Sequence, residues 1–333
     1  MRGGMHRFVV GTGRCGSTLL SRMLAMHPDL LSIFEFFNGL DGTRRFAPEP
    51  VDGNAFWEII SQPHPFITMI TARGYPVEEI TYPFSDSSRY RPEDDIPWLL
   101  VTTLGRLAED PDALLDRTGE FARSRPRATL REHYIALFDW LADACGKTIW
   151  NERSGSSIDY MGDLAVTFPE AKFLHIHRAG EEASLSMREH HAFRLAISLV
   201  HGLHPEVDVA AAIEARRPVP GQEDPLRKVL ESRPSAEFFG RFWSDQLARG
   251  YRQLRHVDAA AYMEVRFEDL VTQPRDTLRE IGSFFDLPGQ EWIEEAAALV
   301  RGLPPSRAGQ LPAEERERLE EVCHVGNQLL GRK

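Results

Sequence analysis

The sequence has few of the features that mark disulfide-rich, membrane-spanning or secreted proteins. Its 333 residues include only three cysteines, Cys15, Cys145 and Cys323, which lie far apart and without paired spacing. We therefore expect neither a disulfide framework nor a cysteine-based zinc site. No apolar run approaches the roughly 18 residues of a membrane span, and the first residues lack the pattern of a signal peptide. These absences predict a cytoplasmic protein without a membrane span.

Positive charge is also scarce. The chain has 39 lysines and arginines against 50 acidic residues, a net charge of −11, and it contains no polybasic tract. Such a balance disfavours nucleic acid or an anionic membrane surface as the main partner. What the chain does have is a hydrophobic content of 42%, enough to bury a large core.

Short apolar segments separated by helical patterns predict an α/β fold. This alternation is typical of a central, mostly parallel sheet covered by helices. A helix is expected from Ser17 to about His27, before Pro28, and another over roughly Arg127–Ala144. The predicted strands are Arg7–Val10, Leu30–Phe34, Thr148–Trp150, Lys172–His177 and Tyr262–Phe267.

Two long segments, approximately residues 36–146 and 187–237, interrupt this order of strands and helices. Neither contains a repeat, a low-complexity tract or a clear domain boundary. We therefore predict a single domain over residues 1–333, in which both segments are insertions that cover the functional edge of the sheet.

Polar residues follow the predicted strands at the positions where ligands bind in open α/β sheets. The glycine-rich loop GTGRCGST follows the first strand, and its amides and the next helix N-terminus would hold a phosphate. Glu35 follows the second strand, and Glu152, Arg153 and Ser154 follow the third. Arg178 follows the fourth strand, with Ser186 in the next predicted helix. Cations, hydroxyls and carboxylates should therefore meet in one crevice.

The glycine-rich loop has three interpretations. Gly11, Gly13 and Gly16 fit a dinucleotide fingerprint, in which Glu35 would bind a ribose of NAD, although Leu19 stands where close packing favours a small residue. The loop also fits a phosphotransferase P-loop, except that Ser17 replaces the lysine and no strand ends in an aspartate placed for Mg²⁺. The third interpretation is a P-loop-like site that is metal-independent, which suits a phosphosulfate donor.

The third interpretation agrees with a family resemblance carried by several segments in order along the chain. GTGRCGSTLLSRMLAMHPDL resembles the 5′-phosphosulfate loop of the sulfotransferases, particularly the bacterial and tyrosylprotein types. Their 3′-phosphate segment is similar to FLHIHRAGEEASLS, and the stretch that carries a cation for the sulfuryl group is similar to NERSG. A late segment of the family resembles VRFEDLVTQPRDTLREIGSFFDLP, and the C-terminal tail resembles SRAGQLPAEERERLEEVC. The resemblance implies an enzyme that uses 3′-phosphoadenosine 5′-phosphosulfate (PAPS) and sulfates a hydroxyl or an amine by in-line displacement.

The resemblance also implies roles for individual residues. Glu35, Arg14 and Arg153 would be catalytic, with Glu35 as the base, and Arg178 with Ser186 would bind the 3′-phosphate. The full set of predicted nucleotide-binding residues is Gly13, Arg14, Cys15, Gly16, Ser17, Thr18, Arg178, Ser186, Phe267 and Arg307. The chain departs from the family where Gly13 replaces proline, Cys15 replaces serine or threonine, and Phe267 replaces tyrosine.

The base and the acceptor stay open at this point. Glu152 competes with Glu35, but its neighbour Arg153 is expected to pair with it and lower its pKa, whereas phenylalanines should desolvate Glu35. FEFFNG (Phe34 to Gly39) and HPFITMI (His64 to Ile70) predict an apolar pocket, which suits a small-molecule, lipid, polyketide or peptide acceptor on the side of the two insertions. The nearby His190, His191, His201 and His204 are expected to be surface or pocket residues rather than a metal site.

Overall fold

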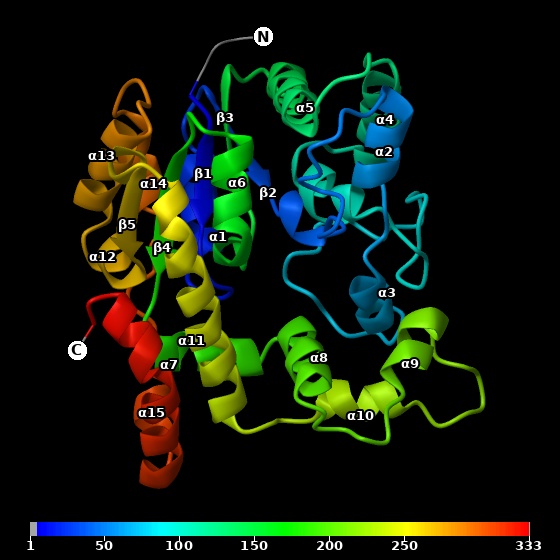
Figure 1. Ribbon diagram of the computed structural model, residues 1–333, viewed down its shortest axis with the longest axis vertical. Coiled ribbons are helices and arrows are strands. Elements are labelled where there is room, and N and C mark those ends of the chain that lie inside the picture. Colours follow the sequence, from blue (N-terminus) through cyan, green and yellow to red (C-terminus); the bar gives the residue numbers. More distant parts are fainter. Residues whose placement is uncertain (1–4, 333) are drawn as a thin grey trace.

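A five-stranded, all-parallel sheet forms the centre of the computed structural model, which describes residues 5–332, apart from the side chains of residues 209 and 210. Residues 1–4 and 333 of the predicted domain, including the start of the N-terminal segment, lie outside the described residues. The strand order is β2-β3-β1-β4-β5, so β1 lies in the middle of the sheet, with β3 and β2 on one side and β4 and β5 on the other (Figure 1). The strands are β1 Arg7–Val10, β2 Leu30–Phe34, β3 Ile149–Arg153, β4 Lys172–His177 and β5 Tyr262–Arg266.

Helices cover both faces of this sheet and extend well beyond it on one side (Figure 1). Their bounds are α1 Ser17–Leu24, α2 Gly53–Ile60, α3 Pro65–Thr71, α4 Pro111–Arg123, α5 Leu130–Ala144, α6 Met161–Thr167, α7 Gly180–Arg188, α8 His191–Val200, α9 Val209–Ala215, α10 Pro225–Glu231, α11 Ala236–Gln253, α12 Phe267–Thr272, α13 Pro274–Phe284, α14 Trp292–Ala297 and α15 Ala313–Leu329. A π-helical segment spans Leu99–Thr103. No helix in residues 5–332 combines the length and apolarity needed to cross a membrane.

β1 and β2 are mostly apolar and buried along their length, as expected for strands of a sheet that is covered on both faces. Side chains alternate along β1, so Phe8 and Val10 enter one hydrophobic core while Val9 enters the other. The first core contains α5 and α6 residues, and the second contains residues of α1, α13 and α14. The predicted α/β fold class is therefore confirmed.

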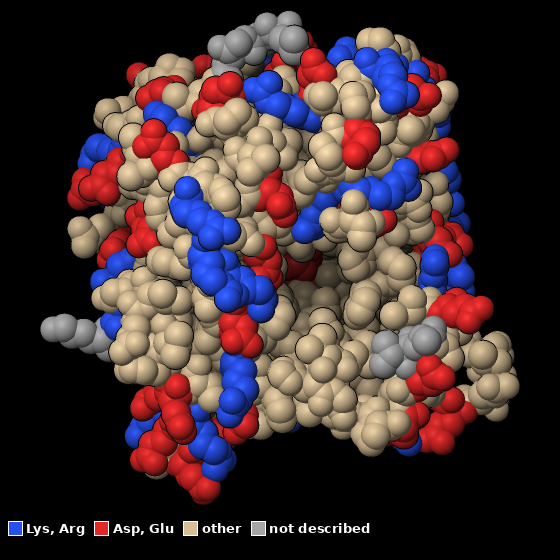
Figure 2. Space-filling view, viewed as in Figure 1, with Lys and Arg blue, Asp and Glu red and all other residues tan. Residues whose placement is uncertain are grey.

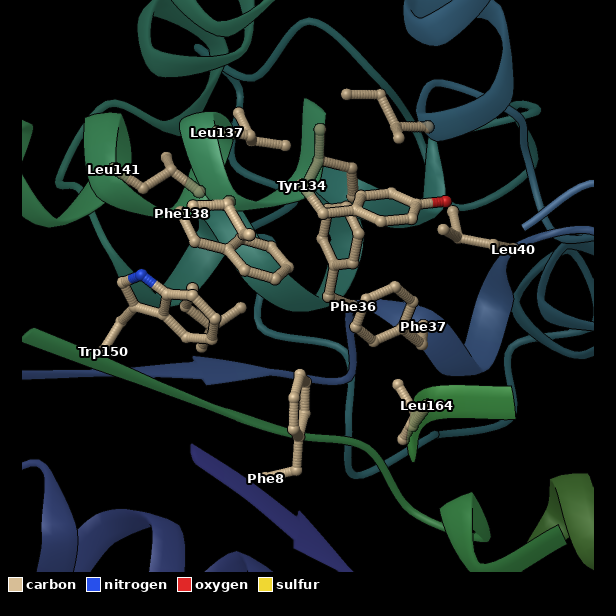
Figure 3. Packing of buried hydrophobic residues seen from close by; sticks show 14 of the residues in the cluster. Phe8, Phe36, Phe37, Leu40, Tyr134, Leu137, Phe138, Leu141, Trp150 and Leu164 are labelled. Atoms are coloured by element: carbon tan, nitrogen blue, oxygen red, sulfur yellow. The ribbon is translucent and has the colours of Figure 1, made fainter. Parts of the chain in front are cut away.

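Aromatic side chains dominate the first core (Figure 3). Phe36 and Phe37 are 1% and 0% exposed, and their rings meet Phe138 and Tyr134 edge-on at centroid distances of 4.8 and 5.0 Å. The prediction that FEFFNG contributes to an apolar ligand pocket is therefore wrong for these two residues. They lie just beyond the end of β2, an edge strand of the sheet, and fill the core rather than facing a ligand.

Several predicted boundaries differ from the structure by a few residues. The third strand continues to Arg153 instead of ending at Trp150, because Ile33 and Phe34 of β2 pair with Glu152 and Arg153. Apolarity alone ended that strand too early. The second predicted helix begins at Leu130, since the Thr129 side chain caps it together with Glu132. The first predicted helix ends at Leu24 rather than His27, and the last strand ends one residue before Phe267, which begins α12.

The two insertions pack against each other. The first carries α2 to α5, and the second carries α8, α9 and α10. Met69 and Ile70 of the first share a small core with Leu195, Val229 and Leu230 of the second. Figure 1 shows α3, α8, α9 and α10 together, beside the sheet rather than on its faces. Segments more than a hundred residues apart thus build one layer next to the ends of the strands.

Candidate active site

A cavity of about 520 Å³ lies beyond the carboxyl ends of the strands and brings most of the predicted site residues together. This is the place where open α/β sheets bind ligands. The predicted residues that line it are Gly13, Arg14, Gly16, Ser17, Thr18, Glu35, Arg153, Arg178, Ser186 and Arg307. We call the part of the cavity formed by these residues, except Glu35, the donor half.

The glycine-rich loop turns sharply into α1 at Gly16. This residue has a φ of 94°, which favours glycine, and a Cβ there would lie 2.2 Å from the ring of Phe267. No side chain caps the helix at Gly16 and no acidic residue lies in its first turn, so the first amides of α1 are left for a ligand. The guanidinium of Arg178 lies over the Phe267 ring at 4.8 Å.

Cys15 lies in this loop but does not present its thiol to the cavity. The side chain is fully buried in the core between the sheet and α1, and burial raises the pKa of the thiol. Cys15 can therefore contribute only backbone groups to a ligand.

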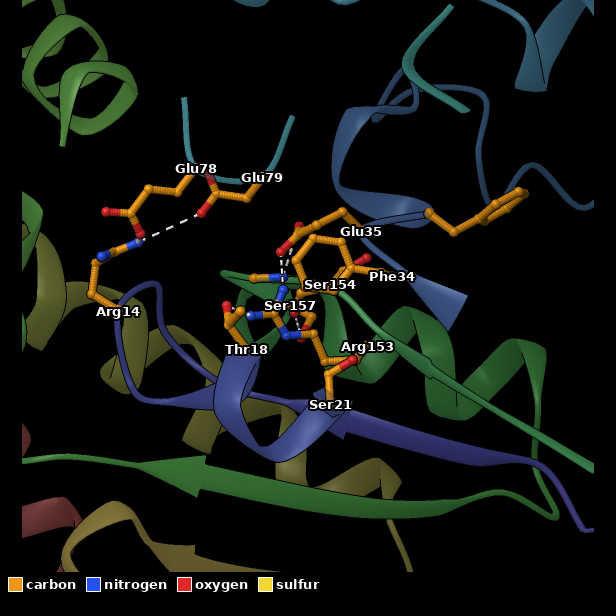
Figure 4. A network of polar contacts seen from close by, with 12 residues as sticks. Arg14, Thr18, Ser21, Phe34, Glu35, Glu78, Glu79, Arg153, Ser154 and Ser157 are labelled. Atoms are coloured by element: carbon orange, nitrogen blue, oxygen red, sulfur yellow. Dashed lines mark hydrogen bonds and ion pairs between the residues drawn. The ribbon is translucent and has the colours of Figure 1, made fainter. Parts of the chain in front are cut away.

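Glu35 and Arg153 form a buried ion pair at the junction between the loop and the first insertion (Figure 4). Arg153 also donates to Thr18 Oγ1 at 2.6 Å, and Gly155 N–H donates to Glu35 Oε2 at 3.0 Å. Burial raises the pKa of Glu35, and it outweighs the opposing charge of Arg153. The carboxyl is thus desolvated, as the sequence predicted, but it is also the partner of Arg153.

The backbone of Glu35 is held from the other side by the π-helical segment and the residue before it. The Trp98 indole donates to the Glu35 carbonyl, and Thr103 Oγ1 donates to the Phe34 carbonyl at 2.8 Å. These bonds join the end of β2 to the first insertion, and none of them was predicted.

Glu152 is not the partner of Arg153, so that prediction is wrong. Neighbouring residues of a strand point to opposite faces, and Glu152 points away from the cavity. It accepts from Ser154 Oγ at 2.5 Å and from the Phe36 amide at 3.2 Å, and burial raises its pKa to about 8. Glu152 is therefore a buried acid that fixes the backbone behind the site.

Arg14 links the donor half to the first insertion through a network that the sequence did not predict. Its guanidinium pairs with Glu78 at 2.8 Å and Glu79 at 3.6 Å (Figure 4). Its Nε donates to Ser186 Oγ at 3.2 Å. Glu79 also binds His190 at 2.9 Å. Burial alone would raise the pKa of Glu79, but its contacts with His190 and Arg14 lower it to about 2.

Arg178 and Arg307 converge through Glu182. Arg178 approaches the Glu182 carboxylate at 3.6 Å, and the backbone amide of Arg307 donates to the same carboxylate at 2.9 Å. Ser306 Oγ donates to it at 2.7 Å. Glu182 therefore anchors the tail segment beside Arg178, a role with no signal in the sequence motif.

We call the part of the cavity formed by Glu35 and residues of both insertions the acceptor half. It comprises Glu35, Asn38, His64, Phe66, Ile67, Val77, Glu78, Glu79, Trp98, His190, Ala192, Phe193 and Ala196. Gly155, Ser156, Phe242 and Pro304 complete the lining of the cavity. The HPFITMI segment is thus only partly in the site, because Met69 and Ile70 belong to the core between the insertions.

The four histidines of the second insertion have separate partners. His190 binds Glu79, His191 contacts the Pro76 carbonyl, His201 lies against the Phe238 ring at a tilt and His204 pairs with Glu206. Only His190 lines the cavity. Across residues 5–332, no three His, Cys, Asp or Glu side chains are grouped so that they could hold a metal ion.

Comparisons with known proteins agree with this architecture. Residues 226–292 match the model of a family described as the sulfotransferase family. A sulfotransferase domain from the curacin biosynthetic pathway is 14% identical, with coverage of 100% of this chain and 99% of that one and a TM-score of 0.50. The chain has the fold of the sulfotransferases. A sulfotransferase domain of the Synechococcus PCC 7002 olefin synthase is 17% identical, with 98% and 96% coverage and a TM-score of 0.46.

The comparisons confirm the predicted sulfotransferase resemblance, and sulfuryl transfer is the activity that the family match supports. They give no support to an NAD-dependent oxidoreductase or a phosphotransferase. A search of curated proteins finds no significant match.

Proposed function

We propose that this protein transfers a sulfuryl group from PAPS to an acceptor hydroxyl or amine. The observation that carries the proposal is one cavity in which a phosphate-type loop, the Arg178–Ser186 pair and a desolvated carboxyl of Glu35 meet. Each of these three parts comes from a different strand end, and each suits a different part of the reaction.

The residues of the donor half fit PAPS. The uncapped amides at the start of α1 suit the 5′-phosphosulfate, and Arg178 with Ser186 suits a phosphate at the 3′ position. Arg153 Nε is buried and has no hydrogen-bond partner among the described residues, as expected for a group that awaits an anion. When bound, PAPS supplies the sulfuryl group, which passes to the acceptor as adenosine 3′,5′-bisphosphate leaves.

Glu35 is the proposed base. Its Oε1 accepts one bond from Arg153 and its Oε2 one bond from Gly155. A carboxylate oxygen can accept more than one hydrogen bond, so both atoms can still take the proton of an acceptor hydroxyl. The raised pKa brings Glu35 closer to the working pH, which favours proton transfer.

Arg153 and Arg14 are the proposed electrostatic residues. Arg153 lies between Glu35 and Thr18, where its charge can stabilise negative charge that develops on the sulfuryl oxygens. Arg14 belongs to the loop itself, and its side chain is 19% exposed. The proposed acceptor is a small molecule, lipid, polyketide or peptide, bound in the acceptor half. The cytoplasmic location and the single domain stay predictions.

A calorimetric comparison of three nucleotides tests the proposal. Adenosine 3′,5′-bisphosphate should bind much more tightly than NAD⁺ or ATP, since it alone carries the 3′-phosphate that Arg178 and Ser186 suit. Tighter binding of NAD⁺ or ATP would instead favour one of the two other interpretations of the loop.

A further inference from the structure

The acceptor half of the cavity has an apolar wall. Phe66 and Ile67 of α3 face it from the first insertion, and Ala192, Phe193 and Ala196 of α8 face it from the second. Small side chains at 192 and 196 leave room beside the two phenylalanines. Burial of apolar surface against such a wall is favourable by about 25 cal/mol per Å², so the wall suits a hydrocarbon body.

The charged side chains of this half are acidic, apart from His190, which contacts Glu79 at 2.9 Å. Glu35, Glu78 and Glu79 line it, and Figure 2 shows acidic side chains in the hollow between the sheet and the insertions. Within the described part of the chain, the lysines and arginines that line the cavity are the four arginines of the donor half. Burial lowers the pKa of His64 to about 4, so this imidazole is neutral near pH 7 and adds no positive charge.

The pairing of Glu78 and Glu79 depends on the donor loop. Arg14 is the cation that contacts both, and Arg14 is also one of the residues proposed to hold the phosphosulfate. An arginine engaged by the donor neutralises these carboxylates less. Glu79 keeps its contact with His190, but the Glu78 side chain is 69% exposed. Donor binding therefore makes the acceptor half more negative than it is in the free protein.

We infer that the acceptor is an apolar alcohol without an anionic group, and that Glu78 and Glu79 exclude anionic acceptors. The inference rests on the proposed sulfotransferase function and adds to it the class of the acceptor. The apolar wall selects the hydrocarbon body, Glu35 receives the hydroxyl, and the two glutamates repel a carboxylate, sulfate or phosphate carried elsewhere on the same molecule.

Binding of three matched alcohols tests this inference. Octanol, aminooctanol and hydroxyoctanoate share a chain and a terminal hydroxyl but end in a methyl, an ammonium and a carboxylate group. Each is titrated by calorimetry into protein saturated with adenosine 3′,5′-bisphosphate, which occupies the donor half. Octanol and aminooctanol should bind roughly tenfold more tightly than hydroxyoctanoate. This is about the effect expected of one repulsive contact between like charges in a partly solvated site. Equal or tighter binding of hydroxyoctanoate, or no binding of any of the three, overturns the inference.

Two variants assign the effect to the glutamates. In the double variant Glu78→Gln/Glu79→Gln, hydroxyoctanoate should bind nearly as well as octanol, while Glu120→Gln, an exposed carboxylate on α4 outside the cavity, should leave the tenfold difference intact. If the double variant does not fold, Glu78→Gln alone can be used, because this side chain is mostly exposed and its replacement should not prevent folding. The single variant should narrow the difference in affinity, because it removes one of the two repelling carboxylates. An unchanged difference in a folded variant overturns the role of these residues.

The nucleotide titration that precedes these measurements keeps two failures apart. Absence of adenosine 3′,5′-bisphosphate binding contradicts the proposed function, and the inference falls with it. Normal nucleotide binding together with a preference for hydroxyoctanoate contradicts the inference alone.

Discussion

The two halves of the cavity differ in what holds them. The donor half lies at the ends of parallel strands, where Arg14, Arg153 and Arg178 each form an ion pair with a carboxylate. The acceptor half stands on short helices of two insertions, which are joined by their own small core rather than by the sheet. The difference means that the donor half depends on the sheet, whereas the acceptor half depends on a separate layer of helices that can vary without disturbing the sheet.

Glu35 lies where the halves meet, and its replacement should have the largest effect. Glu35→Gln keeps the shape and removes the basicity, so single-turnover sulfuryl transfer should fall by roughly 10² to 10⁴. Affinity for adenosine 3′,5′-bisphosphate should stay near that of the unmodified protein, because the donor half is intact. Glu152→Gln is the matched control and should retain near-normal transfer. The reverse pattern would make Glu152 the base and Glu35 a structural residue.

The pH dependence of stability tests whether Glu152 is a buried, protonated acid. Burial raises the pKa of Glu152 from 4.5 to about 8, so the folded state holds this proton more tightly than the unfolded state. The resulting stability is fully present below about pH 4.5 and is lost as the pH rises toward about 8, a change on the order of a few kcal/mol. Urea unfolding between about pH 5 and pH 8 should therefore show a smaller loss for Glu152→Gln. Parallel curves for the two proteins would mean that Glu152 is ionised in the folded state.

Arg178→Ala tests the donor half alone. Loss of a charge-assisted hydrogen bond costs about 1.5–3 kcal/mol, so affinity for adenosine 3′,5′-bisphosphate should fall roughly 10- to 150-fold. Affinity for AMP, which lacks the 3′-phosphate, should change little. Calorimetry with both nucleotides measures this difference, and an equal loss for the two would argue against Arg178 as the 3′-phosphate residue.

The contact between Gly13 and Phe193 tests how firmly the halves are joined. A Cβ at Gly13 would lie 2.0 Å from the Phe193 ring, so Gly13→Ala should lower the free energy of unfolding by about 1–3 kcal/mol through overpacking. Removal of the ring in Gly13→Ala/Phe193→Ala should make the added methyl group harmless. A double-mutant cycle by urea unfolding measures the coupling, and additive losses would show that the ring and the loop do not interact.

The donor half could be predicted from the sequence because its residues follow apolar strands directly. Parallel strands bring their carboxyl ends to one edge, so Arg14, Arg153 and Arg178 of this half were predicted to lie near one another and near Glu35. The same logic did not assign side-chain partners. The pairing of Arg153 with Glu35 rather than Glu152 depends on the strand register, since one step along a strand reverses the face of the sheet.

His64, Phe66 and Ile67 of the HPFITMI segment line the acceptor half, as the sequence predicted. The contacts that assemble this half could not be predicted, because they form between distant segments. Glu79 and His190 meet only after the two insertions have packed together, and neither lies in a motif. Phe36 and Phe37 were predicted to line a pocket but are buried in the core. Aromatic residues beside a candidate catalytic residue can pack in the core as readily as they can line a pocket.

Glu35 has a φ of 56°, in the left-handed region that side chains disfavour. A residue other than glycine sacrifices about 1–2 kcal/mol in that conformation, whereas glycine adopts it freely. The Trp98 indole and the Gly155 amide hold the residue in place despite this penalty. Glycine at position 35 would relieve this strain but would leave the buried guanidinium of Arg153 without its carboxylate partner. The backbone strain at Glu35 therefore accompanies the presentation of one carboxyl group in a fixed direction.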